Sequence, residues 1–393
     1  MSAVLEGSVR KAGDHVRITT QLINTEDGSH RWSETYDRKL SDVFAVQDEI
    51  AKAVVGVLRV KLLLGKSPGA LEHRTSNTDA YLDYLAGRGL MERELRRDSW
   101  RRAQEAFQHA VDRDPSFAPA WAGLGYMRSR TADYLPTVAE HIEFKARALT
   151  EINKSLALAP DFSEAYTLRG IMRLRDQFDW SGAQTDFERS LALNPEDPFA
   201  LEQYGYWFQA WRGQLREAAQ SLRKAVERDP INASLWHRLG CIYLFSGEMG
   251  EARKAFDHEY EISGAFSSDD GWPMYLLILE GKAADALNVA GRMDSEAWRL
   301  AGAALAQHAL GHEQQSIQAL ASLRADHAAG FSVQVAQIYA YRGETAAAFE
   351  WLERAHQNRD PGMMRLKVDP LLRMLRGDPR YTALLKKMNL PLD

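Results

Sequence analysis

Prolines recur along this 393-residue chain at two intervals of 35 residues, preceded by a longer one of 45 residues. They are Pro115, Pro160, Pro195 and Pro230, and each closes a stretch with apolar residues at helical spacing. A period of about 34 residues is typical of proteins built from repeated helix pairs. Because one such pair cannot bury its apolar face alone, neighbouring pairs must stack on one another. The interval therefore predicts a mostly α-helical chain of stacked helix pairs.

The clearest repeat shows how the two helices of a pair are expected to pack. Its signature positions are Trp236, Leu239, Gly240, Tyr243, Ala252 and Phe256. Small residues at Gly240 and Ala252 allow two antiparallel helices to approach closely, and the larger side chains fill the seam between them. Gly264 stands where a proline would end the second helix.

This pattern resembles the tetratricopeptide repeat, whose signature is W-x2-L-G-x2-Y followed by A-x3-F and a proline. The resemblance implies an α-solenoid, a right-handed superhelix of about eight helix pairs over residues 77–358. Residues 66–76 are predicted as a linker and residues 359–393 as a capping tail. In the tail, Asp378 and Pro379 are expected to start a short final helix with Tyr381 and Leu384 on one face.

The first 65 residues follow a different pattern. Val16, Ile18 and Leu22 alternate with polar residues, which predicts a half-buried strand. Turns are expected at residues 11–14 and 24–28, a third strand over residues 30–36 and a helix over residues 43–64. Residues 1–65 are therefore predicted as a small α/β segment, whose open strand edge near Val4 favours a homodimer through that edge.

Four runs in this segment resemble the second half of the TolB-like domain in their order and spacing. They are Val4-Leu-Glu-Gly-Ser-Val-Arg, Val16-Arg-Ile-Thr-Thr-Gln-Leu-Ile, Trp32-Ser-Glu-Thr-Tyr-Asp-Arg and Val43-Phe-Ala-Val-Gln-Asp-Glu-Ile. The resemblance covers residues 4–64, and the tail resembles the end of proteins in the same families. It implies the regulatory half of a bacterial signalling protein with a class III adenylate cyclase or winged-helix effector domain.

Composition and motifs limit the chemistry of the chain. A net charge of -5 argues against a nucleic-acid partner, and no apolar run is long enough to span a membrane. The single cysteine, Cys241, cannot form an internal disulfide, which favours the cytoplasm. Phosphate-binding loops and local zinc motifs are missing, and Asp269 and Asp270 fit a solvated turn. The sequence therefore predicts no catalytic residue, no metal site and no cofactor.

The expected function is a scaffold that binds a protein or peptide partner along the first helix of each repeat. The register of the repeats assigns these partner-binding positions to Tyr126, Arg130, Thr167, Arg175, Glu202, Tyr206, Gln209 and His237. This mixture of aromatic and polar groups suits an extended peptide or a protein helix. The Lys/Asn pairs that clamp chaperone carboxylates are replaced by Ala122, Tyr126, Thr167 and Ile171.

Two other interpretations stay open at this point. In the first, the chain is the C-terminal fragment of an adenylate cyclase whose effector domain is missing. In the second, it is the sensory half of a winged-helix transcription regulator. The start at Met1 would then mark a truncated gene product or a degenerate paralogue.

Overall fold

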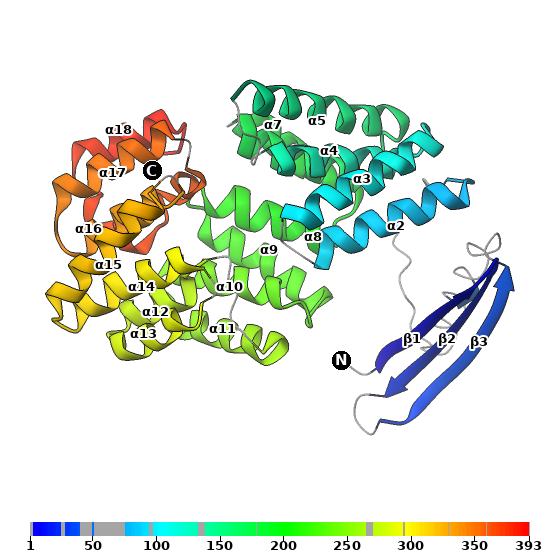
Figure 1. Ribbon diagram of the computed structural model, residues 1–393, viewed down its shortest axis with the longest axis horizontal. Coiled ribbons are helices and arrows are strands. Elements are labelled where there is room, and N and C mark those ends of the chain that lie inside the picture. The colour runs from blue at the N-terminus through cyan, green and yellow to red at the C-terminus, as the bar shows by residue number, and fades with distance from the viewer. Residues whose placement is uncertain are drawn as a thin grey trace. The chain divides into compact units, whose positions relative to one another are not determined.

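The protein is described by a computed structural model. It describes residues 3–24, 28–39, 49–50, 75–93, 97–132, 138–177, 179–264, 270–293, 295–328, 330–358 and 360–392. The chain divides into two compact units, residues 1–162 and residues 163–393 (Figure 1).

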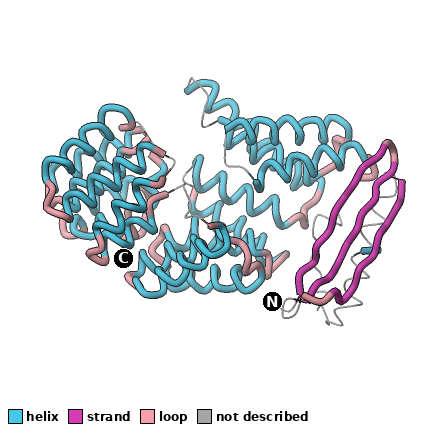
Figure 2. Tube along the Cα trace, turned by 60° about the horizontal axis from the view of Figure 1, so that its bottom comes forward, coloured by secondary structure: helices cyan, strands magenta, loops and turns pink. Residues whose placement is uncertain are grey.

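The first unit begins with a three-stranded antiparallel sheet, drawn in magenta in Figure 2. Its strands, in the order β1-β2-β3, are β1 (Ala3–Ala12), β2 (His15–Asn24) and β3 (His30–Lys39). Gly13, with a φ of 62°, supplies the tight turn between β1 and β2. Val16 and Leu22 are buried and Ile18 is half-buried, as the alternating pattern predicted, and Tyr36 of β3 is buried as well. The helix predicted over residues 43–64 lies outside the described residues, apart from 49–50.

Two helix pairs complete the described part of this unit. They are α2 (Thr78–Arg93) with α3 (Arg97–Arg113), and α4 (Ala118–Ala132) with α5 (Val138–Leu158). The fully buried ring of Phe107 fills the seam, and a Cβ added to Gly87 or Gly123 would lie under 3.0 Å from it. Only glycine permits this approach, so the seam explains the small residue of the signature.

The second unit contains six helix pairs among its described residues. They are α6 (Ser163–Met172) continued by η2 (Arg173–Gln177) with α7 (Trp180–Leu193), α8 (Pro198–Glu202) continued by η3 (Gln203–Ala210) with α9 (Leu215–Arg228), α10 (Ala233–Ser246) with α11 (Met249–Ser263), α12 (Trp272–Leu279) with α13 (Ala283–Gly291), α14 (Glu296–Ala309) with α15 (Glu313–Asp326), and α16 (Ser332–Tyr341) with α17 (Thr345–Gln357). The stretches η2 and η3 are π-helical, a feature that the sequence pattern did not predict.

The same local contacts return in different repeats. The indole N–H of Trp236 donates to the carbonyl of Pro230 at 2.9 Å, and Trp121 makes the same bond to Pro115 at 2.9 Å. Each tryptophan thus ties the start of a first helix to the loop before it. The signature tryptophan therefore has a hydrogen-bonding role in addition to its packing role.

First helices contact one another from repeat to repeat in the second unit. In sequence order η3 contacts α10, α10 contacts α12, α12 contacts α14, and α14 contacts α16. Second helices make no comparable contacts with one another among the described residues. We call the surface formed by η3, α10, α12, α14 and α16 the inner face.

Three Asp-Pro pairs organise the C-terminal tail. Asp360, Asp369 and Asp378 each accept a backbone hydrogen bond from the residue two positions later. They start the 3-10 helices η4 (Pro361–Arg365) and η5 (Pro370–Leu375) and the helix α18 (Pro379–Lys387). Proline is suited to the first turn because its missing N–H would have no helical partner there. The predicted final helix is confirmed, and Tyr381 and Leu384 are buried on its packed face.

Candidate functional site on the inner face

The C-terminal tail does more than cap the last repeat. Its 3-10 helices η4 and η5 pack against α16, and α18 packs against α17 (Figure 1). Apolar tail side chains such as Met363, Leu366, Val368 and Leu372 are buried. A tail that only capped the array would have one polar, exposed side. These apolar side chains are buried instead, so they belong to the core of the second unit.

At α16 the tail is held by two aspartates. Asp360 accepts a hydrogen bond from the backbone N–H of Val333 at 3.2 Å. Asp369 accepts one from the side-chain amide of Gln337 at 2.5 Å, and the oxygen of that amide accepts from the Tyr275 hydroxyl at 3.1 Å. The tail is therefore connected through Gln337 to α12, two repeats earlier.

Further contacts take the tail back along the inner face. Arg373 donates to the backbone carbonyl of Phe245, at the end of α10. The guanidinium of Arg365 stands 5.2 Å from the ring centroid of Trp272 in α12. Lys367 lies against Gly213, directly after η3, where an added Cβ would be 2.9 Å from its side chain. The tail thus contacts first helices, or their ends, from four different repeats.

Several predicted partner-binding residues are not exposed. Tyr206 and Thr167 have no exposed surface, and Gln209 and His237 are buried. Thr167 shares a hydrogen bond of 2.7 Å with Ser190, so it belongs to the seam between α6 and α7.

The remaining predicted positions are partly exposed. Arg175 and Tyr126 are half-buried. Glu202 forms an ion pair of 3.4 Å with Arg238. Arg130 lies over the ring of Trp100, with 4.3 Å between the guanidinium carbon and the ring centroid. The structure therefore brings together Glu202, Tyr206 and His237 in the second unit, and Tyr126 and Arg130 belong to α4 in the first.

His237 is the centre of a buried polar cluster. Its Nδ1 lies 2.9 Å from a carboxylate oxygen of Glu259, and its Nε2 lies 3.0 Å from a carboxylate oxygen of Asp270. The sulfur of Cys241, one helical turn later in α10, lies 3.5 Å from the same Nε2. The cluster joins α10 to α11 and to Asp270, two residues before the start of α12.

Opposite charges control the ionisation of this cluster. Burial is the largest single influence on the pKa of His237 and lowers it, but the charges and hydrogen bonds of Asp270 and Cys241 together outweigh burial, and the pKa of His237 rises well above its ordinary value. Burial alone raises the pKa of Asp270, but His237, Arg238 and Arg365 hold that pKa below its ordinary value. The imidazolium is thus stabilised between two carboxylates, which satisfies both of its N–H groups.

Sequence reasoning missed part of this cluster. It placed Asp270 in a solvated turn, whereas its side chain is buried and accepts from the backbone N–H of Trp272 at 3.3 Å. Asp269 lies outside the described residues. Cys241 is fully buried in α10. Arg365 could not be assigned because it lies 93 positions after Trp272, the aromatic residue that it contacts.

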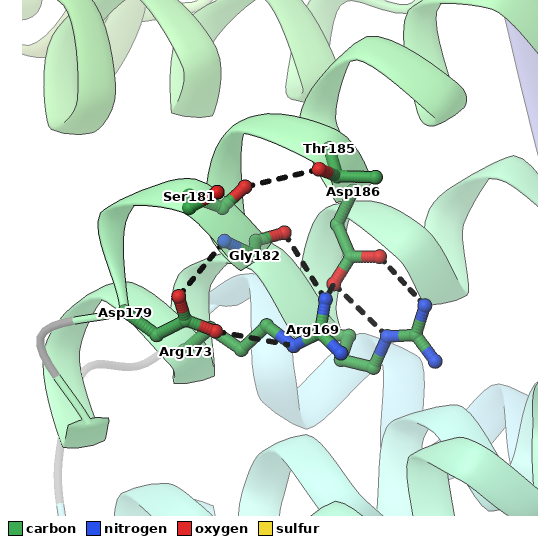
Figure 3. Close-up of polar contacts among 7 residues, drawn as sticks. All are labelled: Arg169, Arg173, Asp179, Ser181, Gly182, Thr185 and Asp186. Atoms are coloured by element: carbon green, nitrogen blue, oxygen red, sulfur yellow. Dashed lines mark hydrogen bonds and ion pairs between the residues drawn. The ribbon is translucent and has the colours of Figure 1, made fainter.

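A second polar cluster lies in the seam of the α6–α7 pair (Figure 3). Arg169 and Arg173 both donate to the carboxylate of Asp186, at 2.6 Å and 2.8 Å. Asp186 is 1% exposed, so this carboxylate depends on the two arginines for its charge balance. Arg173 also donates to the carbonyl of Gly182, which ties η2 to the first turn of α7. This cluster holds the repeat together.

Residues 233–263, which form the α10–α11 pair, match the family model of the tetratricopeptide repeat. This match identifies the α10–α11 pair as a tetratricopeptide repeat, and the glycine–phenylalanine seams recur in other helix pairs. A fold of stacked helix pairs of this type supports a protein-interaction scaffold. Among the described residues, no helix has the length and apolarity needed to cross a bilayer.

One curated relative is a putative adenylate cyclase 3 from Rhizobium meliloti (strain 1021). It is 38% identical over 121 residues, which is 31% of this chain and 20% of that protein. The match therefore spans about a fifth of the length of the relative.

Solved structures with a similar arrangement include PilF of Pseudomonas aeruginosa, 16% identical, with a TM-score of 0.43 over 55% of this chain and 94% of that one. A human IFIT1 dimer with m7Gppp-AAAA is 16% identical, with a TM-score of 0.47 over 71% of this chain and 72% of that one. YrrB, a repeat protein with an unusual peptide-binding site, is 21% identical, with a TM-score of 0.31 over 50% and 91%.

Proposed function

We propose that this chain is a non-enzymatic signalling scaffold of the bacterial cytoplasm that binds a peptide or protein partner along its first helices. The observation behind the proposal is the tail, which lies on the inner face of the second unit as a bound peptide would. In two of its polar contacts a tail side chain meets a backbone group of a repeat: Arg373 donates to Phe245, and Asp360 accepts from Val333. A partner segment would therefore need polar side chains that reach backbone groups of the first helices.

The tail also indicates which features a partner segment needs. Its buried apolar residues alternate with aspartates that accept hydrogen bonds from α16, and with the cation of Arg365 beside an aromatic ring. A partner for the inner face would therefore present an apolar segment with interspersed charges. Tyr206 and His237 are buried, so the half-buried Arg175 and Glu202 are the predicted positions of the second unit that such a partner would contact.

Photo-crosslinking tests the proposal with the intact chain. A photoreactive phenylalanine analogue replaces Tyr126 on the first helix α4, and in a matched control it replaces Tyr260, which is 47% exposed on the second helix α11. We expect a discrete adduct with a protein of the source cell at Tyr126 and none at Tyr260. Equal adducts at both positions, or adducts at neither, would contradict binding through the first helices.

A second candidate function has its own support. The match to a putative adenylate cyclase suggests that this chain corresponds to a regulatory segment that acts on a cyclase domain, in agreement with the TolB-like resemblance. Purified chain incubated with ATP and Mg²⁺ is expected to form no cyclic AMP. Addition of the chain to a cyclase domain from the source organism should change the rate of that domain. Cyclic AMP formation by the chain alone would contradict the scaffold proposal.

A further inference from the structure

Three side chains with different donor atoms converge in the second unit. The Nε2 of His237, the Sγ of Cys241 and a carboxylate oxygen of Asp270 all lie within 4.8 Å of one another, and all three residues are buried. A nitrogen, a thiolate sulfur and a carboxylate oxygen are the donors that zinc takes in proteins. His237 and Cys241 are four residues apart on α10, so one helix face presents both.

The spacing of these atoms matches a tetrahedral site. Zn–N bonds of about 2.0 Å and Zn–S bonds of about 2.3 Å give an N···S edge of about 3.5 Å and an N···O edge of about 3.3 Å. The corresponding distances here are 3.5 Å for Nε2 to Sγ and 3.0 Å for Nε2 to the oxygen of Asp270. The third distance, from Sγ of Cys241 to the oxygen of Asp270, is at most 4.8 Å, and a tetrahedral site has an S···O edge of about 3.5 Å. A metal ion would therefore require a movement of about 1.3 Å at most between these two atoms.

The surrounding residues supply what a zinc site needs beyond its ligands. The carboxylate of Glu259, 2.9 Å from Nδ1, accepts from the ring nitrogen that faces away from the site and fixes the orientation of the imidazole. The Tyr206 hydroxyl is fully buried and has no hydrogen-bond partner among the described residues. It is close enough for the charges of Cys241 and Asp270 to act on it. With three protein ligands, the fourth position of a tetrahedral site would be taken by a water.

We infer that His237, Cys241 and Asp270 form a zinc site, in which the metal fastens the start of α12 to α10 beneath the C-terminal tail. Binding releases two protons, one from Nε2 of His237 and one from Sγ of Cys241, and brings in two positive charges. The net charge of the cluster is therefore the same with and without the metal, so the fold accommodates either state without an unpaired buried charge.

Cobalt(II) is the probe that tests this site in the full-length chain, because it takes the place of zinc and reports its ligands by colour. Cys241 is the only cysteine of the chain, so a thiolate-to-cobalt charge-transfer band can arise from this position alone. We expect that band, together with visible d–d bands of tetrahedral intensity, to saturate at one equivalent of cobalt. One equivalent of zinc should then abolish both.

Three variants complete the test. Cys241→Ser should remove the charge-transfer band, and Glu259→Gln should keep it while weakening zinc binding by about 10- to 100-fold. His258→Gln, at an exposed position next to Glu259 on α11, is the matched control and should bind as the wild type does. Circular dichroism confirms the helix content of each variant.

The outcomes separate clearly. Appearance of the band in the wild type and its loss in Cys241→Ser support the site. Absence of the thiolate-to-cobalt band at stoichiometric cobalt overturns the proposed site. Cobalt that is bound only by surface histidines would not give this band. Zinc affinity that is unchanged in both Cys241→Ser and Glu259→Gln overturns it as well.

Discussion

Individual charged residues hold repeats of this chain together from the inside. Asp186 receives two arginines from the neighbouring helix and is almost fully buried, and Arg128 donates to both carboxylate oxygens of Glu151 at 2.9 Å and 2.8 Å. Removing one partner of a buried pair is costly because the other charge is left without compensation. Such residues therefore matter more for stability than exposed ion pairs do.

We expect Asp186→Asn to lower the free energy of unfolding by about 3 kcal/mol, because two guanidinium groups would then face an uncharged amide. Thr185→Ala is the matched control, since Thr185 is exposed on the same helix and its change should be within about 0.5 kcal/mol. Hydrogen exchange measured by mass spectrometry should show faster exchange of α6 and α7 in Asp186→Asn only. Equal exchange in both variants would show that the cluster contributes little.

At the scale of elements, the glycine–phenylalanine seam determines how closely two helices of a pair approach. A Cβ added at Gly240 would lie 2.7 Å from ring carbons of Phe256, whereas one added at Gly250 in α11 would meet nothing within 4 Å. Close packing therefore requires glycine at position 240 but not at position 250, although both residues lie in helices of the same repeat.

The two substitutions are expected to have opposite signs. Gly240→Ala should lower the free energy of unfolding by about 1–3 kcal/mol through overpacking. Gly250→Ala should raise it by about 0.5–1 kcal/mol, because alanine is the better helix former. Urea unfolding followed by circular dichroism measures both. A stabilising Gly240→Ala would contradict the close seam.

The tail is an element whose attachment should depend on pH. Burial raises the pKa of Asp369, although the hydrogen bond from Gln337 acts in the opposite direction. A carboxyl with a raised folded-state pKa contributes stability below its unfolded pKa of about 3.9 and loses it as the pH rises through the folded value. We therefore expect Asp369 to destabilise the folded tail progressively as the pH rises from about 3.9 to the folded-state pKa of Asp369.

Asp369→Asn isolates this contribution, since the amide does not titrate. Urea midpoints of the wild type and the variant should be compared from about pH 4 to about pH 7. The wild type should lose stability relative to Asp369→Asn as the pH increases. Parallel pH profiles would mean that the Asp369 carboxyl has no raised pKa in the folded chain.

The fold could be predicted where the determinants are local, and the site could not where they are distant. The seam of Gly240 and Phe256 and the turn at Gly13 follow from nearby residues, and both were anticipated. The buried position of Asp270 depends on His237 in another helix, and the tail reaches Phe245 from Arg373. Neither the register of the repeats nor the helix propensity of single residues predicts these long-range contacts. The inner face was therefore expected to be open to a partner.

At the scale of the whole molecule, the sheet of the first unit offers an unpaired edge. Among the described residues β1 pairs only with β2, and Val9 on β1 is 67% exposed. An exposed strand edge with apolar side chains favours pairing with a second copy of the chain. Self-association through β1 would bring two sets of repeats into one assembly, and bivalent binding of a partner would then increase its apparent affinity.

Val9→Lys tests this self-association, because it places a positive charge on each of the two edges that would meet. Sedimentation velocity over a range of concentrations should show a monomer–dimer equilibrium for the wild type. The dissociation constant should increase by about tenfold or more for Val9→Lys, which corresponds to about 1.4 kcal/mol. Val9→Thr keeps the β-branched shape without the charge, and it should dimerise nearly as the wild type does. A wild type that stays monomeric at every concentration, or equal constants for Val9→Lys and Val9→Thr, would exclude β1 as the dimer interface.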